Sequence, residues 1–486
     1  MLPSKGIETI EELKKYFSIP EKKVDYLLDI LKFFDFKRIH KRLDGLKRQG
    51  SSISSILSVF IILPFLNHAS VHALLRSGSK NMAGGGKDVY YRARNRQDID
   101  WRKVLTSFVK RFLAIIDQKG DNDGAGPRCL ALDDSYLPKV GTKAEFVGRV
   151  FDHVTHRFLI GLRLLQLCFY DGKSTVPIDF SIHREKGKNA SKPYGLTNKQ
   201  LKQQVKGSRI EGSASDIRAK EVDVSKMKVG IEMIKRALKF LKVDYVLMDS
   251  WFTSEAMIEC VRGKAESNKA PKAHLIGMMK MGNAKYLYNG RLYDAASLLK
   301  HLKRTLKVSN CKKLKAFYIV ADVKYKDYPV RIYFSRFGNR GKWHLLLSTD
   351  KSLSYVRMME IYRIRWTIEV FFHEGKGLLG LGKCQSTTFE AQIADATVTM
   401  IQYILLTLKK RFEDYETRGA VFRDVSEQIQ ERKLHVRLWE LLLVIVKMVI
   451  ESLELIIDDI DAVVTKIIKD NRLNGVADLI SMKNQT

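Results

Sequence analysis

The chain has 486 residues, which is enough for two or three domains with a sizeable hydrophobic core. Hydrophobic residues make up 45% of it and aromatic residues 10%, which indicates a globular protein and excludes an intrinsically disordered one. Because 85 Lys and Arg residues outnumber 54 Asp and Glu residues, for a net charge of +31, we expect a polyanionic partner such as nucleic acid or an anionic membrane surface.

The first part of the chain, residues 1–118, is predicted to be helical and basic. Apolar residues recur at helical spacing in residues 10–17 and 24–36, and a charge-dense connector follows at 37–50. Basic helices that carry aromatic side chains suit DNA binding, although a solvated surface gives the same pattern. The opening residues lack the apolar stretch of a signal peptide, so we expect a cytoplasmic protein.

A membrane partner is disfavoured by the two longest apolar runs. Residues 56–66 are too few to span a bilayer, and four charged residues interrupt residues 438–457. The five cysteines lie far apart, which predicts neither a zinc cluster nor a disulfide framework and fits a reducing cytoplasm. Nucleic acid is therefore the preferred polyanion.

A Gly- and Asp-rich loop at residues 118–127 predicts a domain boundary, after which the pattern changes. Residues 157–170 and 174–182 are apolar runs joined by an Asp-Gly pair, which predicts a β-hairpin with a tight turn. Helical and strand patterns then alternate between residues 225 and 279. A hairpin followed by alternating helices and strands predicts a mixed α/β domain.

Two segments interrupt this α/β pattern. Residues 184–221 are polar, basic and rich in Gly and Ser, so we predict a mobile loop that becomes ordered on DNA. Residues 283–350 indicate a β-rich insertion whose aromatic and basic residues alternate. This alternation suits a nucleic-acid surface, but an edge hairpin produces it as well. A long helix is predicted near residues 352–380, and a helical C-terminal region covers residues 411–486.

Acidic side chains follow two of the apolar strands. Asp133 and Asp134 end the strand that starts at residue 128, and Asp249 ends the strand that starts at residue 243. Side chains at the strand ends of an α/β sheet converge on ligands, so these carboxylates are candidate site residues. A single strand-end Asp carries little weight, because the chain has 54 acidic residues and Asp is common in turns.

Four polar residues of the predicted long helix share one face. They are Tyr362, Arg365, Glu369 and Lys376, which fall within about 60° of one another on an α-helix. This stripe could grip a phosphodiester, because the cations and the phenol can bind phosphate oxygens while the carboxylate holds a metal ion. By spacing alone, a solvated helix face with an Arg365–Glu369 ion pair explains the pattern equally well.

Glu369 and the two strand ends would supply three carboxylates from separate elements. Hard oxygen ligands of this kind select Mg²⁺. Two such ions could activate water or a 3′-hydroxyl on one side of a phosphorus and stabilise the leaving oxygen on the other. These carboxylates, together with the cations of the stripe, therefore predict metal-dependent chemistry on a phosphodiester.

The spacing Tyr, two residues, Arg, three residues, Glu, six residues, Lys resembles the signature helix of bacterial insertion-sequence transposases of the insertion sequence 4 family. The stretches LALDDSYLPK and YVLMDSWF look like the two aspartate motifs of this family. The resemblance covers about residues 128–410 and implies an α/β fold, with an RNase H-like mixed-sheet catalytic core and the β-rich insertion at 283–350. Helical regions would flank this core, for DNA binding at 1–118 and for dimerisation at 411–486.

The resemblance also assigns catalytic roles to single residues. Asp134, Asp249 and Glu369 would form a DDE catalytic triad that ligates Mg²⁺, for which Mn²⁺ could substitute. Asp133 is the alternative to Asp134 as the first carboxylate, because the family's motif often carries two acids at this point.

Four further residues would contact DNA. They are Tyr362, Arg365 and Lys376, which would bind phosphates near the cleaved end, and Trp343 in the last strand of the insertion. In related enzymes a tryptophan of that strand stacks on a base flipped from the transposon end. A buried strand tryptophan is the alternative interpretation of Trp343.

We therefore expect a DNA transposase that catalyses cut-and-paste transposition by Mg²⁺-dependent phosphodiester hydrolysis and strand transfer. Its partners would be the double-stranded DNA of terminal inverted repeats and of the target, bound by a homodimer at the nucleoid of a bacterial cytoplasm. A catalytically silent or domesticated DNA-binding descendant and an RNase H-like nuclease are the alternatives. Inverted repeats flanking the gene would favour the transposase over both.

Overall fold

The structure is a computed structural model of the 486-residue chain. It describes residues 41–427 except 42, 48, 67, 69, 78–84, 119–125, 153–154, 265–270 and 414. Residues 31–423 form one compact unit, which contains all the helices and strands named below. The predicted dimerisation region and the first 40 residues of the predicted DNA-binding region lie almost entirely outside the described residues.

A mixed sheet of twelve strands runs through this unit, in the order β2-β3-β1-β5-β6-β12-β11-β10-β7-β8, with β4 paired to β3 and β9 paired to β10. The strands are β1 (Cys129–Pro138), β2 (Gly148–Asp152), β3 (Arg157–Tyr170), β4 (Thr175–His183), β5 (Tyr245–Met248), β6 (His274–Met279), β7 (Lys285–Tyr288), β8 (Arg291–Asp294), β9 (Ser309–Cys311), β10 (Ala316–Tyr325), β11 (Tyr328–Phe337) and β12 (Trp343–Ser348). Strands β1, β5 and β6 are parallel, whereas β3 and β12 pair antiparallel to β1 and β6. The predicted mixed α/β class is confirmed.

The β3–β4 hairpin follows directly from its sequence. Asp171 Oδ1 accepts the backbone N–H groups of Lys173 and Ser174 at 2.9 and 2.8 Å, which closes the turn. Gly172 has a φ of 107°, in the region that a side chain would strain. The Asp-Gly turn that the sequence predicts is therefore present.

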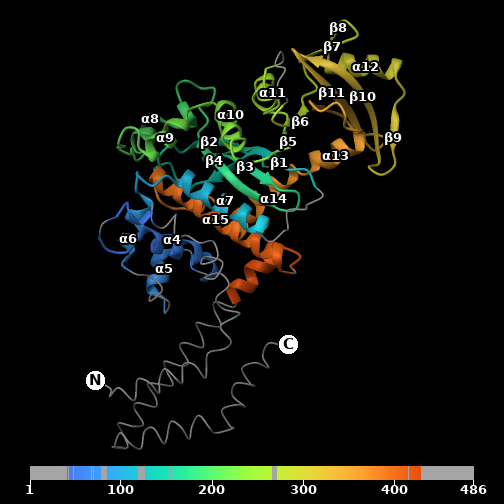
Figure 1. Ribbon diagram of the computed structural model, residues 1–486. Coiled ribbons are helices and arrows are strands. Elements are labelled where there is room, and N and C mark those ends of the chain that lie inside the picture. The colour runs from blue at the N-terminus through green and yellow to red at the C-terminus, as the bar shows by residue number, and fades with distance from the viewer. Residues whose placement is uncertain are drawn as a thin grey trace, which may run out of the picture. The chain divides into compact units, whose positions relative to one another are not determined.

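Helices are distributed along the whole described part of this unit. They are α4 (Ile53–Ile62), η1 (Leu63–Leu66), α5 (Val71–Arg76), α6 (Lys87–Arg94), α7 (Trp101–Gln118), η3 (Pro193–Gly195), α8 (Asn198–Lys202), α9 (Ala214–Glu221), α10 (Lys226–Ala237), α11 (Glu255–Arg262), α12 (Ala295–Thr305), α13 (Tyr355–Arg363), α14 (Trp366–Gly377) and α15 (Phe389–Phe412). Helices α7 and α15 pack against each other and against β4, while α10 packs against β3, β4 and α11 (Figure 1). Every residue of β4 is buried as a result.

The predicted insertion is β-rich, but its strands belong to the same sheet as the core. Strand β12 pairs with both β6 and β11, so the predicted β10–β11 hairpin continues the core sheet. Helix α12 was not predicted within this segment. It contacts β7 and β8 through an apolar side on which Leu298 and Leu302 are fully buried.

The prediction of a mobile loop at residues 184–221 is wrong. The segment contains α8 and α9, and two of its cations, Arg209 and Arg218, lie beside buried carboxylates. Arg209 Nη2 donates to Glu145 Oε2 at 2.6 Å, and Arg209 Nε lies 2.9 Å from Glu390 Oε1, with all three side chains less than 10% exposed. The polar composition predicted a loop because the partners of these cations lie far away in the chain.

The long helix predicted near residues 352–380 is divided into α13 and α14. At the junction the backbone hydrogen bonds tighten to three-residue spacing, from the Arg365 N–H to the Tyr362 carbonyl and from the Ile368 N–H to the Arg365 carbonyl, each at 3.1 Å. Tyr362 therefore lies in the last turn of α13, and Arg365 is the residue that precedes α14.

Helix α15 is the one described helix that is long and apolar enough to cross a membrane. However, 94% of its most apolar window is buried inside the structure, and its neighbours include α7, α14 and β4. Burial of this kind is typical of a core helix.

Candidate active site

The ends of β1 and β5 place two carboxylates side by side. The two strands are parallel neighbours, and Leu132 is paired with Met248 in their register. Asp133 and Asp249 come next in each strand's direction, so their backbones lie roughly one strand spacing apart, about 5 Å. The acids therefore meet at one edge of the sheet.

Asp133 is mostly buried and interacts with an arginine from α14. Its side chain is 18% exposed, and Arg365 Nη1 donates to its Oδ2 at 2.8 Å. Burial raises the pKa of Asp133 to about 7, with the Arg365 charge opposing this rise and the Asp249 charge adding to it. The raised pKa shows that Arg365 alone does not compensate the charge of this carboxylate, which a bound cation would stabilise.

Glu369 reaches the same guanidinium from the first turn of α14. Arg365 Nη2 donates to Glu369 Oε1 at 2.7 Å, so one side chain bridges Asp133 and Glu369. The Arg365 side chain is only 17% exposed, which strengthens both charged hydrogen bonds. Arg365 therefore occupies the space between two of the three carboxylates.

Tyr362 lies behind these carboxylates rather than in front of them. It is 8% exposed, and its hydroxyl donates to the Met248 carbonyl at 3.4 Å, directly before Asp249. Burial raises the pKa of Tyr362 to about 12. The phenol supports the end of β5, and the prediction that it binds DNA phosphates does not agree with this burial.

Lys376 lies near the end of α14 and contacts β1 two residues beyond Asp133. Its Nζ donates to Ser135 Oγ at 2.8 Å and lies 4.5 Å from the centre of the Tyr136 ring. Burial lowers the pKa of Lys376 to about 8. Ser135 is two residues from Asp133 and so shares its face of the strand, which places Lys376 beside the carboxylates without a described contact to them.

Asp134 points to the opposite face of β1, because successive side chains of a strand alternate. Lys226, at the start of α10, donates to Asp134 Oδ2, and Arg163 Nη1 lies 3.4 Å from Asp134 Oδ1. Two cations thus neutralise this acid. The structure groups Asp133, and not Asp134, with Asp249 and Glu369, which favours Asp133, the alternative in the sequence analysis, as the first carboxylate.

Trp343 lies at the same edge of the sheet as Asp249. It begins β12, which runs antiparallel to β6, and the C-terminal end of β6 lies beside that of β5. Lys303 Nζ and the Arg336 guanidinium carbon lie 4.8 and 5.2 Å from the centre of its partly buried ring. These cations hold the indole, and its stacking on a flipped base stays a prediction.

Three residues at this edge were missed from the sequence. Trp251 follows Asp249 by two residues and is 44% exposed, and Trp366 begins α14 and is 62% exposed. An aromatic residue one or two positions after a motif residue, Arg365 or Asp249, was the available signal. Lys226 had no such signal, because its partner Asp134 lies 92 residues earlier in the chain.

The donor set suits a hard divalent cation, but the side chains are not arranged around one. Asp133, Asp249 and Glu369 offer only carboxylate oxygens, which Mg²⁺ prefers. Among the described residues, no three Asp, Glu, His or Cys side chains converge closely enough to hold a metal ion. Because the Arg365 guanidinium lies between two of the carboxylates, it must move before they can share a cation.

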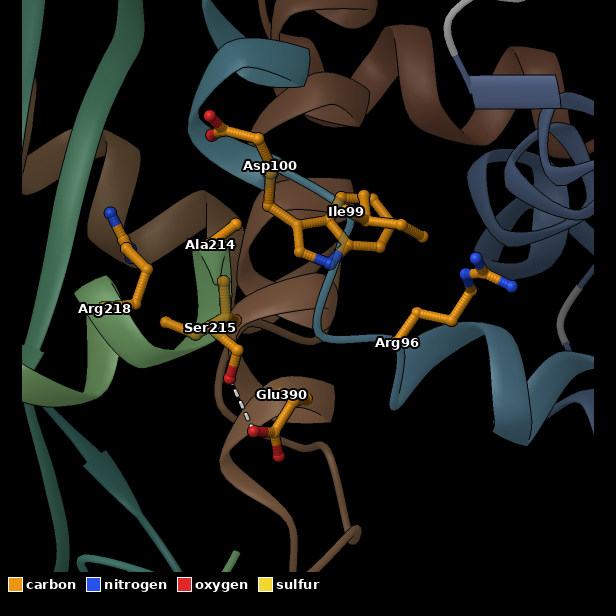
Figure 2. Close-up of a pocket in the computed structure, with 9 residues that line it drawn as sticks. Arg96, Ile99, Asp100, Ala214, Ser215, Arg218 and Glu390 are labelled. Carbon is orange, nitrogen blue, oxygen red and sulfur yellow. Dashed lines mark hydrogen bonds between the residues drawn. The ribbon is translucent and has the colours of Figure 1, made fainter. Parts of the chain in front are cut away.

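A hollow lined by residues of α7, α9 and α15 lies away from these carboxylates. Figure 2 shows Ser215 pointing toward Glu390, and Ser215 Oγ donates to Glu390 Oε1 at 2.6 Å. Arg209 Nε also lies 2.9 Å from that oxygen. The carboxylate in this hollow is already neutralised, so the hollow offers less to a reacting group than the edge of β1 and β5.

Comparison with known protein families adds independent evidence. Residues 172–405, just under half of the chain, match the family model described as Transposase DDE domain. The matched region contains Asp249 and Glu369 and begins after Asp133 and Asp134. The match supports a DDE transposase and implies that the chain binds DNA. No curated protein matches the chain.

Proposed function

We propose that the protein is a DNA transposase of the insertion sequence 4 family that moves an insertion sequence by cut-and-paste transposition. Asp133, Asp249 and Glu369 are its catalytic carboxylates in this proposal. Asp133 replaces Asp134 as the first carboxylate in this proposal, because Asp133 shares Arg365 with Glu369 and interacts with the Asp249 charge.

The observation that carries the proposal is the bridge from Asp133 through Arg365 to Glu369, at 2.8 and 2.7 Å, beside Asp249. Arg365, which precedes α14, thus connects an acid of β1 with an acid of α14, and Asp249 lies at the end of the neighbouring strand β5. The strand order β4-β3-β1-β5-β6, with antiparallel pairs on one side of β1 and parallel pairs on the other, supports an RNase H-like core.

The three carboxylates would hold Mg²⁺, or Mn²⁺ in its place, which supplies activation of the attacking oxygen and stabilisation of the leaving oxygen. Arg365 and Lys376 would bind phosphate oxygens of the cleaved strand. In the first step a water oxygen bonds to phosphorus and the P–O3′ bond breaks, which leaves a 3′-hydroxyl. That hydroxyl then bonds to a phosphorus of the opposite strand, whose P–O3′ bond to the flanking DNA breaks, which forms a hairpin. A second water bonds to the hairpin phosphorus and releases the 3′-hydroxyl, which then bonds to a phosphorus of target DNA as the P–O3′ bond there breaks.

Other parts of the proposal concern DNA recognition and assembly. The N-terminal region 1–118 would bind the terminal inverted repeats, and Trp343 would stack on a base flipped from the transposon end. Residues 411–486 would pair two protomers on the DNA. These roles rest on the resemblance and on the net charge of +31.

The test of this function is cleavage of DNA that flanks the gene, with Mg²⁺ or with EDTA. We expect Mg²⁺-dependent cutting at one position by the wild-type chain, and no detectable cutting by Asp249→Asn or Glu369→Gln. Asp249→Asn is preferable to an Ala substitution, because Asp249 Oδ1 accepts the backbone N–H groups of Trp251 and Phe252 at 2.9 and 3.2 Å. The Asn oxygen can keep these bonds while the charge is lost.

Unfolding midpoints of both variants, measured by circular dichroism, control for loss of the fold. A wild-type chain that binds the fragment but never cuts it would favour the catalytically silent DNA-binding protein. Cutting by the variants at the wild-type rate would overturn the assignment of the carboxylates.

DNA binding should weaken steeply with salt. If the excess of cations serves a phosphate backbone, the logarithm of the binding constant falls linearly with the logarithm of salt concentration, with a slope near −0.9 per phosphate neutralised. Fluorescence anisotropy of a labelled duplex between about 50 and 200 mM salt measures this slope. A flat dependence over that range would contradict the proposed partner.

A further inference from the structure

Trp251 presents a large aromatic surface to solvent directly beside a proposed catalytic carboxylate. It is 44% exposed, whereas its neighbour Phe252 is 1% exposed and anchors the turn in the core. The two rings meet edge-on with their centroids 4.7 Å apart. Leaving an indole in water is unfavourable, so an exposed tryptophan two residues from a proposed catalytic acid is a candidate contact for a partner.

The turn that carries Trp251 is held by Asp249 itself. Asp249 Oδ1 accepts the N–H groups of Trp251 and Phe252, and its backbone carbonyl accepts the Thr253 hydroxyl at 2.7 Å. The carboxylate and the indole are therefore fixed relative to each other. Trp251 follows Asp249 by two residues, and two residues span at most about 7 Å of chain. This length corresponds to roughly two nucleotide steps of about 3.4 Å along a DNA strand.

A fixed cation lies on the Trp251 ring. Lys226 Nζ is 4.2 Å from the ring centre and donates to Asp134 Oδ2, and the Lys226 side chain is 17% exposed. Asp134 is held in turn by Arg163, whose Nη2 donates to Glu185 Oε1 at 2.7 Å. These ion pairs fix Lys226 at the face of β1 opposite Asp133.

We propose that Trp251 and Lys226 form a nucleotide platform, on which an unpaired base within two nucleotides of the scissile phosphate stacks. The indole supplies the flat apolar surface, Lys226 supplies a positive charge for the phosphate of that nucleotide, and Asp134 is a positioning residue for Lys226. The platform rests on the proposed function, because it needs DNA cleavage at Asp133, Asp249 and Glu369.

Charge decides which partner this surface fits. An apolar protein surface would gain nothing from an ammonium group beside the indole, whereas a nucleotide uses both, through its base and its phosphate. Base stacking on an aromatic side chain changes affinity by about 5- to 150-fold. The platform would therefore hold the end of the opened strand without reading its sequence through hydrogen bonds.

The test uses the full chain and the DNA fragment that it cleaves, in EDTA so that the DNA stays intact. The fluorescent base 2-aminopurine is placed in turn at each position around the cut. We expect the wild-type chain to change the emission of 2-aminopurine at one position within two nucleotides of the cut. Trp251→Ala should remove that change and weaken binding about 5- to 150-fold. Trp251→Phe should retain part of both effects.

An abasic nucleotide at that position makes the test specific. If the base stacks on Trp251, removing the base should cost the wild-type chain affinity but cost Trp251→Ala nothing further. Lys226→Met should weaken binding in the same range, and Asp134→Asn should weaken it less. Leu292→Ala is the matched control, since Leu292 is 67% exposed on β8 at the far end of the sheet order and should leave binding unchanged.

The platform is wrong if the wild-type chain cuts the fragment but Trp251→Ala binds it equally well and the abasic nucleotide costs both proteins the same. It is also wrong if Trp251→Ala alters only the oligomeric state in sedimentation, because the indole then faces protein. A wild-type chain that neither binds nor cuts the fragment would instead overturn the proposed function.

Discussion

Asp133→Asn is expected to lower the rate of metal-dependent DNA cleavage by about 1000-fold or more, whereas Asp134→Asn should keep at least about a tenth of the wild-type rate. The two variants make the same chemical change at adjacent residues. They differ because Asp133 faces Asp249 and Arg365, while Asp134 faces Lys226 and Arg163. A loss of 1000-fold corresponds to about 4 kcal/mol of transition-state stabilisation.

Single-turnover cleavage with saturating enzyme measures the effect, because it removes the weaker DNA binding that Asp134→Asn should cause. Each variant serves as the control of the other, since both keep the side chain's shape and lose one charge. If Asp134→Asn were inactive and Asp133→Asn active, the assignment of Asp134 from the sequence would be correct. The reaction would then take place at the face of β1 that carries Asp134.

This pair also shows where sequence reasoning stops. Apolar runs ending in acids were enough to predict that strand ends carry the site, because this pattern is local. Alternation along a strand predicts only that Asp133 and Asp134 point to opposite faces of the sheet. Which of the two faces α14 depends on how the sheet packs against that helix. The same limit applies to Tyr362. Its position on one helix face with Arg365, Glu369 and Lys376 did not reveal that its side chain is buried at the end of α13.

Long-range ion pairs account for the other errors. Residues 184–221 have the composition of a loop, but Arg209 is anchored to Glu145 and Glu390, which lie in separate parts of the chain. The β10–β11 hairpin and the Asp-Gly turn were predictable, since their partners are neighbours in sequence. Local patterns therefore predicted elements, while contacts between distant charges decided which surfaces became ordered.

Arg365→Gln is expected to tighten Mn²⁺ binding to the DNA-free protein by about 10-fold or more. In the structure the guanidinium bridges Asp133 and Glu369, so a metal ion must displace it before the carboxylates can act as ligands. A DNA phosphate is an alternative partner for this guanidinium, and a guanidinium that binds phosphate leaves the carboxylates free. DNA should therefore raise the metal affinity of the wild-type chain, by about 5- to 150-fold for a typical coupling free energy.

Electron paramagnetic resonance of free Mn²⁺ measures this affinity without requiring cleavage. Arg365→Gln should abolish the coupling between DNA and metal, because the guanidinium that blocks the carboxylates and that DNA phosphate would draw away is gone. Arg331→Gln is the matched control, since Arg331 donates to Asp322 Oδ1 at a comparable 2.8 Å on the β10–β11 hairpin, away from the three carboxylates. Equal metal affinity of the wild-type chain with and without DNA would show that Arg365 is a structural ion pair only. If coupling is found, the arginine would keep the carboxylates closed to metal until a DNA phosphate is in place, so that hydrolysis begins only on a bound substrate.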